Sequence, residues 1–433
     1  MMRRAAAAGC LAATAAALLL PGRWYLLAWL PFGLGAWQVL RLDRRAAFAL
    51  IAAGGVLLPL VAARQPPTSS DDMYRYVWDG RVQLAGVEVY RYPPSAPQLE
   101  PLRDDFLWPD TANWCVPSGC TRINRPDVPT IYPPVAEAVF AAVAVVSPGT
   151  ARELPMQLTM AAFAAVVGML LWYALRRLGR DPRRAVLWAW CPLVALEAGN
   201  NAHVDVVAAG LAAAALWQLA GHPGTRRAVA GGVLLGLAVA TKLTPALLGP
   251  ALLRRRPVAV AVSAAAAVAT VYLPHVLAAG PAVLGYLPGY LHEEGYADGA
   301  RFALLAAVLP AALTAPAAAC VLAGLAVLTW RTADPARPWR AAATMVGGAL
   351  LVTAPSYPWY ATLLVMLVAF GAPAEWLAVA VAGYVAQFAP ELGLTVHTGQ
   401  LIGYPAALAA VLAGWAVRHG CARAPARAAA PAP

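Results

Sequence analysis

Long apolar runs alternate with short polar breaks along almost the whole chain. The clearest runs occupy residues 5–21, 24–40, 46–63, 156–175, 339–354, 357–371, 375–389 and 400–417. A helix needs roughly 20 apolar residues to cross a bilayer, and fewer where the span is short. The pattern therefore predicts an all-α polytopic membrane protein with about eleven to thirteen transmembrane helices.

Composition supports this class and excludes a nucleic-acid-binding protein. The 433 residues are 61% hydrophobic and only 12% charged. The formal net charge of +11 comes from arginines clustered between the apolar runs, near residues 41–45, 176–184, 226–227, 254–256 and 331–340. Such clusters are typical of cytoplasmic loops. We found no basic patch interleaved with aromatic residues that could stack on bases.

The charge pattern also predicts the topology and the division of the chain. With a cytoplasmic N-terminus and a retained first span, residues 1–63 form N-terminal transmembrane helices and residues 64–134 form a large extracytoplasmic loop. Residues 135–420 form the helical bundle, with a polar loop near 276–301, and residues 421–433 form a disordered cytoplasmic tail. Counting back from the C-terminus gives the same orientation.

The middle of the bundle is irregular. The run 134–147 is too short for an ordinary span, and an odd number of crossings is needed to place Arg176–Arg184 inside. The run 228–253 is broken at residues 241–245. Broken helices are tolerated where they line a cavity or pack in protein. No internal repeat is evident, which weakens an interpretation as a transporter with inverted halves.

The loop begins with a predicted amphipathic helix. Two serines and Asp71 provide a helix N-cap, and helical spacing places Asp72, Tyr76 and Asp79 on one face. Such a helix would lie on the membrane surface with its carboxylates outward. A partly desolvated carboxylate there could take a proton from a sugar hydroxyl. Capping and surface ion pairs with Arg75 and Arg81 are the structural alternative.

Two of the six cysteines share the loop. Cys115 and Cys120 flank a Pro/Gly turn, and on the oxidising side of a membrane they would form a small disulfide-closed loop. Two free thiols are the alternative. No cysteine spacing matches a zinc or iron–sulfur site.

Several segments of the loop resemble a known family. The residues that carry the resemblance are 71–82, 86–94, 123–127 and 130–134, and more loosely 199–205, 242–245 and 357–360. They resemble the first extracytoplasmic loop of GT-C glycosyltransferases, above all bacterial, largely actinobacterial, mannosyltransferase-like members. The similarity covers most of the chain, but the specific motifs lie in the loop.

The resemblance implies an activity. Members transfer a sugar from a polyprenyl-phosphate donor outside the membrane with inversion, and an acidic residue at the start of the loop is the base. That role falls on Asp72 or its neighbour Asp71. The acceptor would be a glycan or glycolipid and the sugar mannose. No strict Asp-x-Asp motif is present, so no cofactor is assigned, and a requirement for Mg²⁺ or Mn²⁺ is left open.

Polar residues within the apolar runs invite functional hypotheses, because charge in a bilayer is costly. Glu197, Asn201 and Asp205 fall on one face of a presumed helix, with His203 alongside. They could form a polar cavity wall that contacts sugar, make interhelical hydrogen bonds, or ligate a metal through His203 and Asp205. Side chains at this spacing diverge on a helix, so no metal site is assigned.

Further residues complete the predicted site. Lys242, the chain's one lysine, could bind the donor phosphate together with Arg75 and Arg81, or could extend to the interface. The predicted substrate cavity comprises Asp79, Tyr132, Asn201, His203, Asp205, Tyr357 and Trp359. Residues 357–360 could equally form an aromatic belt at the membrane interface. The polar residues of 275–301 could equally form an ordinary solvated loop.

The sequence thus predicts a plasma-membrane hexosyltransferase with its active site on the extracytoplasmic side. Two other functions stay open at this stage. A secondary transporter or exporter of lipid or sugar would concentrate charges at the midplane of the membrane. A non-catalytic subunit of an envelope assembly complex would tolerate the loss of Asp72.

Overall fold

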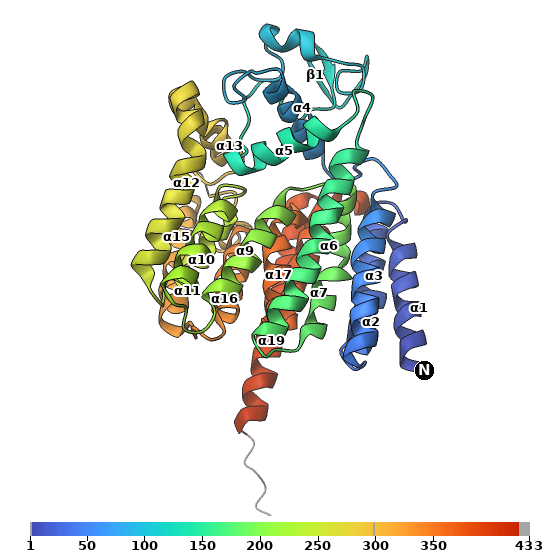
Figure 1. Cartoon of the computed structure of the whole chain (residues 1–433), viewed down its shortest axis with the longest axis vertical. Coiled ribbons are helices and arrows are strands. Elements are labelled where there is room, and N and C mark those ends of the chain that lie inside the picture. Colours follow the sequence, from blue (N-terminus) through green and yellow to red (C-terminus); the bar gives the residue numbers. More distant parts are fainter. Residues whose placement is uncertain (1, 298, 424–433) are drawn as a thin grey trace, which may run out of the picture.

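The protein is a helical bundle that carries a polar lobe at one end (Figure 1). The computed structural model describes residues 2–297 and 299–423, and it is 71% helical. This confirms the predicted all-α membrane fold. The lobe is formed by the chain between α3 (Arg44–Ala62) and α6 (Leu154–Arg177), which includes the predicted loop. Most of the expected C-terminal tail, residues 424–433, lies outside the described residues.

The elements before the C-terminal half follow in chain order, with the longest connections in the lobe. Before the lobe come α1 (Met2–Ala17), η1 (Gly22–Ala28) and α2 (Trp29–Val39). The lobe contains α4 (Asp72–Leu84), η2 (Pro97–Leu102), β1 (Trp114–Val116), β2 (Gly119–Thr121) and α5 (Pro134–Val146). After α6 the chain forms η3 (Pro182–Ala185), α7 (Val186–Ala189), α8 (Pro192–Val194), the π-helix η4 (Ala195–Asn200), α9 (Asp205–Leu219), α10 (Thr225–Val239), η5 (Thr244–Leu248) and α11 (Gly249–Leu252).

The C-terminal half completes the bundle. It contains α12 (Pro257–Ala279), η6 (Gly280–Leu284), α13 (Leu287–Glu293), α14 (Ala303–Ala306), α15 (Ala311–Thr332), α16 (Pro338–Thr353), η7 (Pro358–Ala361), α17 (Thr362–Phe370), η8 (Ala374–Trp376), α18 (Leu377–Gln387), η9 (Ala389–Leu392) and α19 (Val396–Arg423). Every residue of α17 is buried. By contrast, α12 and α15 are largely exposed and lie at one edge of the bundle in Figure 1, where they would face lipid.

Within the described residues, five helical segments are long and apolar enough to cross a membrane. They are Arg44–Ala62, Leu154–Arg177, Pro257–Glu293, Ala311–Thr332 and Val396–His419. Shorter apolar helices pack among them, including α9 and the segment Pro358–Phe370. Several of the predicted spans are short helices in the structure: the run 24–40 contains the 11-residue α2, and the run 375–389 contains the 11-residue α18.

Within the lobe, α5 lies next to the bundle, and its short length accounts for the irregular middle of the sequence. This helix has 13 residues, which gives a length of about 20 Å and leaves it short of a bilayer core of about 30 Å. In Figure 1, α5 lies across the end of the bundle beneath α4, whereas α6 runs to the opposite end. One crossing therefore joins the lobe to the arginine cluster at 176–184, as the charge pattern requires.

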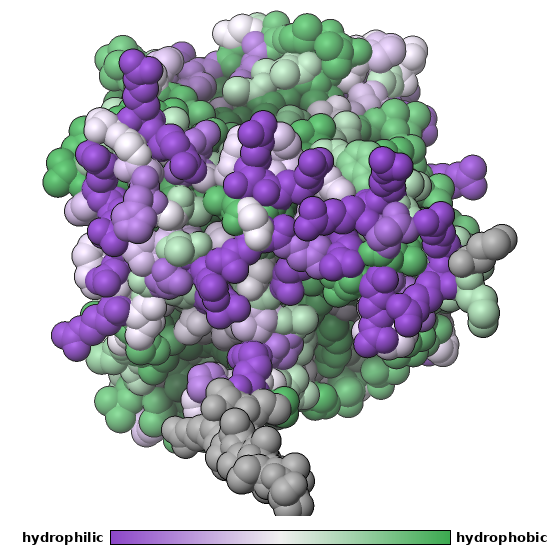
Figure 2. All heavy atoms as spheres, turned by 60° about the horizontal axis from the view of Figure 1, so that its bottom comes forward, coloured by the Kyte–Doolittle hydropathy of each residue, from purple (hydrophilic) through white to green (hydrophobic). Residues whose placement is uncertain are grey.

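The arginine-rich turns gather at the end of the bundle opposite the lobe. Arg183 donates to the carbonyl of Leu42 at 2.9 Å, and Arg184 donates to the carbonyls of Val368 and Ala372 at 2.7 Å. Figure 2, with this end turned forward, shows a broad band of hydrophilic residues. The molecule therefore has one basic end and one end that carries the lobe.

The predicted loop helix is present as α4, but it is more enclosed than a surface helix. Of its residues, Met73, Tyr74, Arg75, Tyr76, Trp78, Asp79, Gly80 and Val82 are buried. Asp79 points inward and pairs with Arg75 at 2.9 Å. The carboxylates of this helix thus face protein instead of the open surface that amphipathicity alone predicted.

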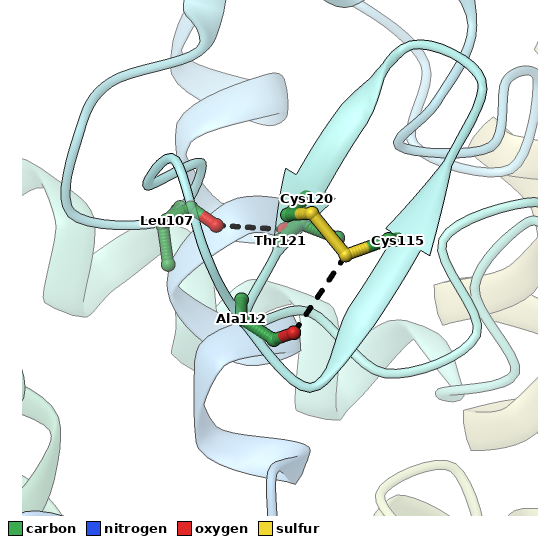
Figure 3. Close-up of a disulfide and its surroundings, with 5 residues drawn as sticks. All are labelled: Leu107, Ala112, Cys115, Cys120 and Thr121. Carbon is green, nitrogen blue, oxygen red and sulfur yellow. Dashed lines mark hydrogen bonds between the residues drawn. A yellow bond between two sulfur atoms is a disulfide. The ribbon is translucent and has the colours of Figure 1, made fainter.

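A disulfide closes the outer hairpin of the lobe (Figure 3). Strands β1 and β2 pair antiparallel with Cys115 opposite Cys120, and these two cysteines are bonded. The hydroxyl of Thr121 donates to the carbonyl of Leu107 at 2.7 Å and ties the hairpin to the rest of the lobe. The ring nitrogen of Trp114 donates to Asp71 at 3.2 Å. The hairpin is therefore anchored beside the start of α4.

Gly80 sets the distance between α4 and α5. A Cβ atom at this position would lie 2.5 Å from the carbonyl oxygen of Phe140. We expect Gly80→Ala to cost about 1–3 kcal/mol, because the two helices must separate. Thermal unfolding of the purified protein in detergent should show a lowered Tm. Gly33→Ala in α2, which has nothing within 4 Å of the new Cβ, is the control; an equal loss in both variants would contradict the close approach.

Candidate active site

The site lies where the start of α4 meets the bundle, and Asp72 is its centre. The side-chain amide of Asn124 donates to Asp72 Oδ1 at 2.6 Å. His203 Nε2 lies 3.6 Å from Asp72 Oδ2, an ion-pair distance. The Asp72 side chain keeps 16% of its surface exposed. It is thus held on both oxygens while part of its surface stays accessible.

The irregular backbone after η4 positions His203. This segment follows a π-helix, a form that is rare in proteins overall but common at functional sites. Ala202 has a left-handed φ of 53°. His203 Nδ1 is 2.9 Å from Glu197 Oε2, and its Nε2 is 3.1 Å from Ser70 Oγ. The sequence placed His203 alongside a helical face formed by Glu197, Asn201 and Asp205, but it did not indicate that His203 contacts Asp72.

Asp72 is ionised in this arrangement. Burial opposes its charged form, but the neighbouring His203, the charge of Lys242 and the bond from Asn124 together lower the pKa of Asp72 to about 2. Burial likewise opposes the charged form of His203, yet the carboxylates of Asp72 and Glu197 raise its pKa to about 9. At neutral pH the site therefore contains an imidazolium between two carboxylates.

Two cations stand near Asp72, and both have carboxylate partners. Lys242 Nζ lies 3.0 Å from Asp205 Oδ2, and Arg125 lies 2.7 Å from Glu293 at the end of α13. Burial lowers the pKa of Arg125, but the bond to Glu293 and the charges of nearby groups raise it by more, so the net shift is upward. The charge of Asp72 is among these influences. Lys242 was singled out from the sequence. Arg125 was visible only as part of the Asn-Arg-Pro segment.

The two arginines of α4 occupy other places. Arg75 is buried against Asp79 and donates to the carbonyl of Val128 at 3.1 Å. Arg81 pairs with Asp104 at 2.7 Å. Nine positions separate Arg81 from Asp72, which places them on opposite sides of the helix. Besides His203, the cations whose charges interact with that of Asp72 are therefore Lys242 and Arg125.

Aromatic residues from the second half of the chain form one wall of the site. Trp359 stacks on His203 with ring centroids 4.1 Å apart, and Tyr357 stacks on Trp359 at 4.9 Å. On the other side, Tyr132 packs edge-on against Tyr76 at 4.9 Å. The residues 357–360 thus reach the predicted site.

Asn200 and Asn201 act as a scaffold for the chain that leads into α4. The Asn200 amide donates to the carbonyls of Ala62, Gln65 and Pro66 at 3.0–3.1 Å. The Asn201 amide donates to Ser69 Oγ at 2.8 Å. Asn201 is completely buried, and its bond to Ser69 holds the segment that leads into α4.

Other features lie outside this cluster. Asp71 accepts a hydrogen bond from the ring nitrogen of Trp114 in the outer hairpin. Across the described chain, no group of three or more His, Cys, Asp or Glu side chains is arranged to hold a metal ion. A groove of about 210 Å³ lies between α4, α5 and the start of α6 and is lined by Val77, Arg81, Leu84, Phe140 and Met156, among others. It is on the Arg81 side of α4 and does not belong to the Asp72 cluster.

The protein has the features of a membrane-embedded enzyme. An acidic side chain, a histidine and further cations come together where the polar lobe meets the helical bundle. The sequence model of Glycosyltransferase family 87 matches residues 130–355, just over half of the chain, and the protein belongs to this family. The family comprises GT-C enzymes, mannosyltransferase-like, that use polyprenyl-phosphate sugars. The match includes His203 and Lys242 and begins after Asp72.

This membership confirms the resemblance. The protein is a multi-pass membrane glycosyltransferase. The two alternative interpretations, a transporter and a non-catalytic subunit, are therefore set aside. No curated protein and no solved structure gives a match to the chain.

Proposed function

We propose that this glycosyltransferase moves a sugar from a polyprenyl-phosphate donor to a hydroxyl of an extracytoplasmic glycan or lipid, with inversion and with Asp72 as the base. The observation that carries the proposal is the Asp72 carboxylate, held between Asn124 and His203 at the junction of lobe and bundle. By resemblance to the mannosyltransferase-like members, mannose is the proposed sugar.

The chemistry requires one proton acceptor. The acceptor hydroxyl attacks the anomeric carbon from the face opposite the phosphate, so that a new C–O bond forms as the bond to the phosphate oxygen breaks. The hydroxyl proton passes to Asp72, and the bonding electrons leave with the polyprenyl phosphate. The leaving group is a stable anion and needs little acid catalysis.

The donor phosphate would be held by cations that the structure places near Asp72. Lys242 also lies 5.8 Å from the ring centroids of Tyr132 and Tyr360, which limits its exposure to water. In a partly desolvated site, preorganised cations stabilise developing phosphate charge strongly. To take that role, Lys242 and Arg125 would exchange the carboxylates of Asp205 and Glu293 for phosphate oxygens. Asp71, Arg75 and Arg81 have no part in this scheme.

Two features support an extracytoplasmic site. The arginine-rich turns lie at the end opposite the lobe, and the positive-inside rule assigns that end to the cytoplasm. The disulfide of the lobe fits an oxidising compartment.

The test is transfer by the purified protein from radiolabelled polyprenyl-phosphate hexoses, mannose first, with a nucleotide-linked mannose as the comparison donor. We expect transfer from the lipid donor and an inverted anomeric configuration in the product by NMR. Transfer from the nucleotide sugar alone, or retention of configuration, would contradict the proposal.

A further inference from the structure

Glu197 is a buried carboxylate with an unusually complete set of partners. Its side chain is 2% exposed. Oε2 accepts from the Asn201 amide and lies next to His203 Nδ1, both at 2.9 Å. Oε1 accepts from the hydroxyl of Tyr384, in α18, at 2.5 Å. A buried carboxylate satisfied by three partners has a fixed orientation, so it fixes the groups bonded to it.

The contacts of the other ring nitrogen of His203, Nε2, indicate the role of Glu197. A neutral imidazole carries one N–H. If His203 Nδ1–H points at Glu197, only the charged ring has a second N–H to direct at Ser70 and Asp72. Because Nε2 faces an ionised carboxylate at 3.6 Å, the arrangement matches the charged ring and fixes its orientation.

We propose that Glu197 is a positioning residue that keeps His203 in its imidazolium form beside Asp72, and so keeps the base ionised and oriented. This inference rests on the proposed role of Asp72 in glycosyl transfer. It adds a carboxylate–imidazole–carboxylate chain that links the bundle to the lobe.

The surroundings of His203 contain few other charges that could replace Glu197. Asp72 faces the ring from α4 and Glu197 from η4. Asp205 at the start of α9 is paired with Lys242, which follows α10. Tyr384 reaches Glu197 from α18, and Trp359 of η7 covers the ring face with an uncharged surface. The pair formed by Lys242 and Asp205 is internally neutralised. Glu197 and Asp72 are thus the anions in contact with His203.

The pH dependence follows from the sign of the His203 shift. Its pKa is raised to about 9, so the ion pair is fully present below the ordinary histidine value of about 6.5 and is lost as pH rises through about 9. Without the Glu197 charge, the His203 pKa falls and the alkaline limb of kcat moves to lower pH.

The direct test is Glu197→Gln, which keeps the side-chain volume and one acceptor oxygen. We expect kcat at pH 7.5 to fall about 10- to 100-fold and the donor KM to change less than about twofold. The alkaline limb of the kcat–pH profile should move down by at least one pH unit. An unchanged limb together with unchanged kcat would overturn the inference.

A readout without turnover separates this inference from the proposed function. In protein with isotope-labelled histidine, NMR titration should show the His203 ring losing its proton at lower pH in Glu197→Gln than in wild type. The signal is assigned by its loss in His203→Asn, one of only six histidines. A shifted titration in a protein that transfers from no lipid donor would support the positioning role while rejecting the proposed reaction. An unshifted titration would reject the positioning role whatever the activity.

Two further variants guard against a general loss of structure. Tyr384→Phe removes one bond to Glu197 and should shift the His203 titration in the same direction by a smaller amount. Glu137→Gln makes the same substitution at a different, fully buried glutamate, whose hydrogen-bond partners include Thr130 at 2.8 Å. It should leave the His203 titration unchanged. A shift of equal size in Glu137→Gln would show that the effect is non-specific and would overturn the inference.

Discussion

Replacing Asp72 by Asn is expected to lower kcat about 10²–10⁴-fold, the range that a general base contributes. The amide keeps the size of the side chain and can still accept from Asn124, so the fold should be retained. What it loses is the charge opposite His203 and the capacity to take the hydroxyl proton. Transfer from a labelled lipid donor under saturating conditions measures the effect.

Asp71→Asn is the matched control for this prediction. Its carboxylate is one position away but is bonded to Trp114 in the outer hairpin. We expect its kcat to stay within about threefold of wild type, because an exposed hydrogen bond contributes little. If Asp71→Asn abolishes transfer and Asp72→Asn does not, the base is assigned to the wrong neighbour.

Lys242→Met should raise the donor KM by about tenfold or more, since a hydrogen bond between charged groups is worth about 1.5–3 kcal/mol. Kinetics with increasing lipid donor, at fixed acceptor, give the value directly. Lys242→Arg retains a cation and should bind the donor more tightly than Lys242→Met.

A second substitution tests whether Lys242 only neutralises its neighbour. Lys242→Met leaves the Asp205 side chain, which is 7% exposed, without its cation, and that alone would be destabilising. In Lys242→Met/Asp205→Asn this charge is gone. If the double variant recovers the wild-type donor KM, Lys242 has a structural role and does not bind phosphate.

The features that could be predicted from the sequence are those that depend on residues close together in the chain. The alternation of apolar and basic segments predicted the membrane class, and the serines before Asp72 marked the start of α4. The break near Lys242 followed from the Thr-Pro step, and the structure places it between α10 and η5. Each of these depends on local backbone preferences or on total apolar length, which a single sequence displays.

The partners of the site residues depend on contacts between distant segments, and these could not be derived. Glu197 was visible on a helical face, but its contact with Tyr384 joins residues 187 positions apart. Asn124 carried no charge or periodicity to single it out. Arg75 is the opposite case: its partner Asp79 lies four residues on, so helical spacing offered an internal ion pair as a ready alternative to phosphate binding.

The separation of Ser70 and His203 by 133 positions has a consequence for biogenesis. As the polypeptide is synthesised and inserted, the lobe emerges long before its imidazole neighbour, and Lys242 follows later still. A nascent chain that has exposed the lobe therefore holds an acid without its counter-ion. The proposed site is complete only when the later helices have been inserted, so a ribosome-bound fragment that ends before Lys242 should be inert.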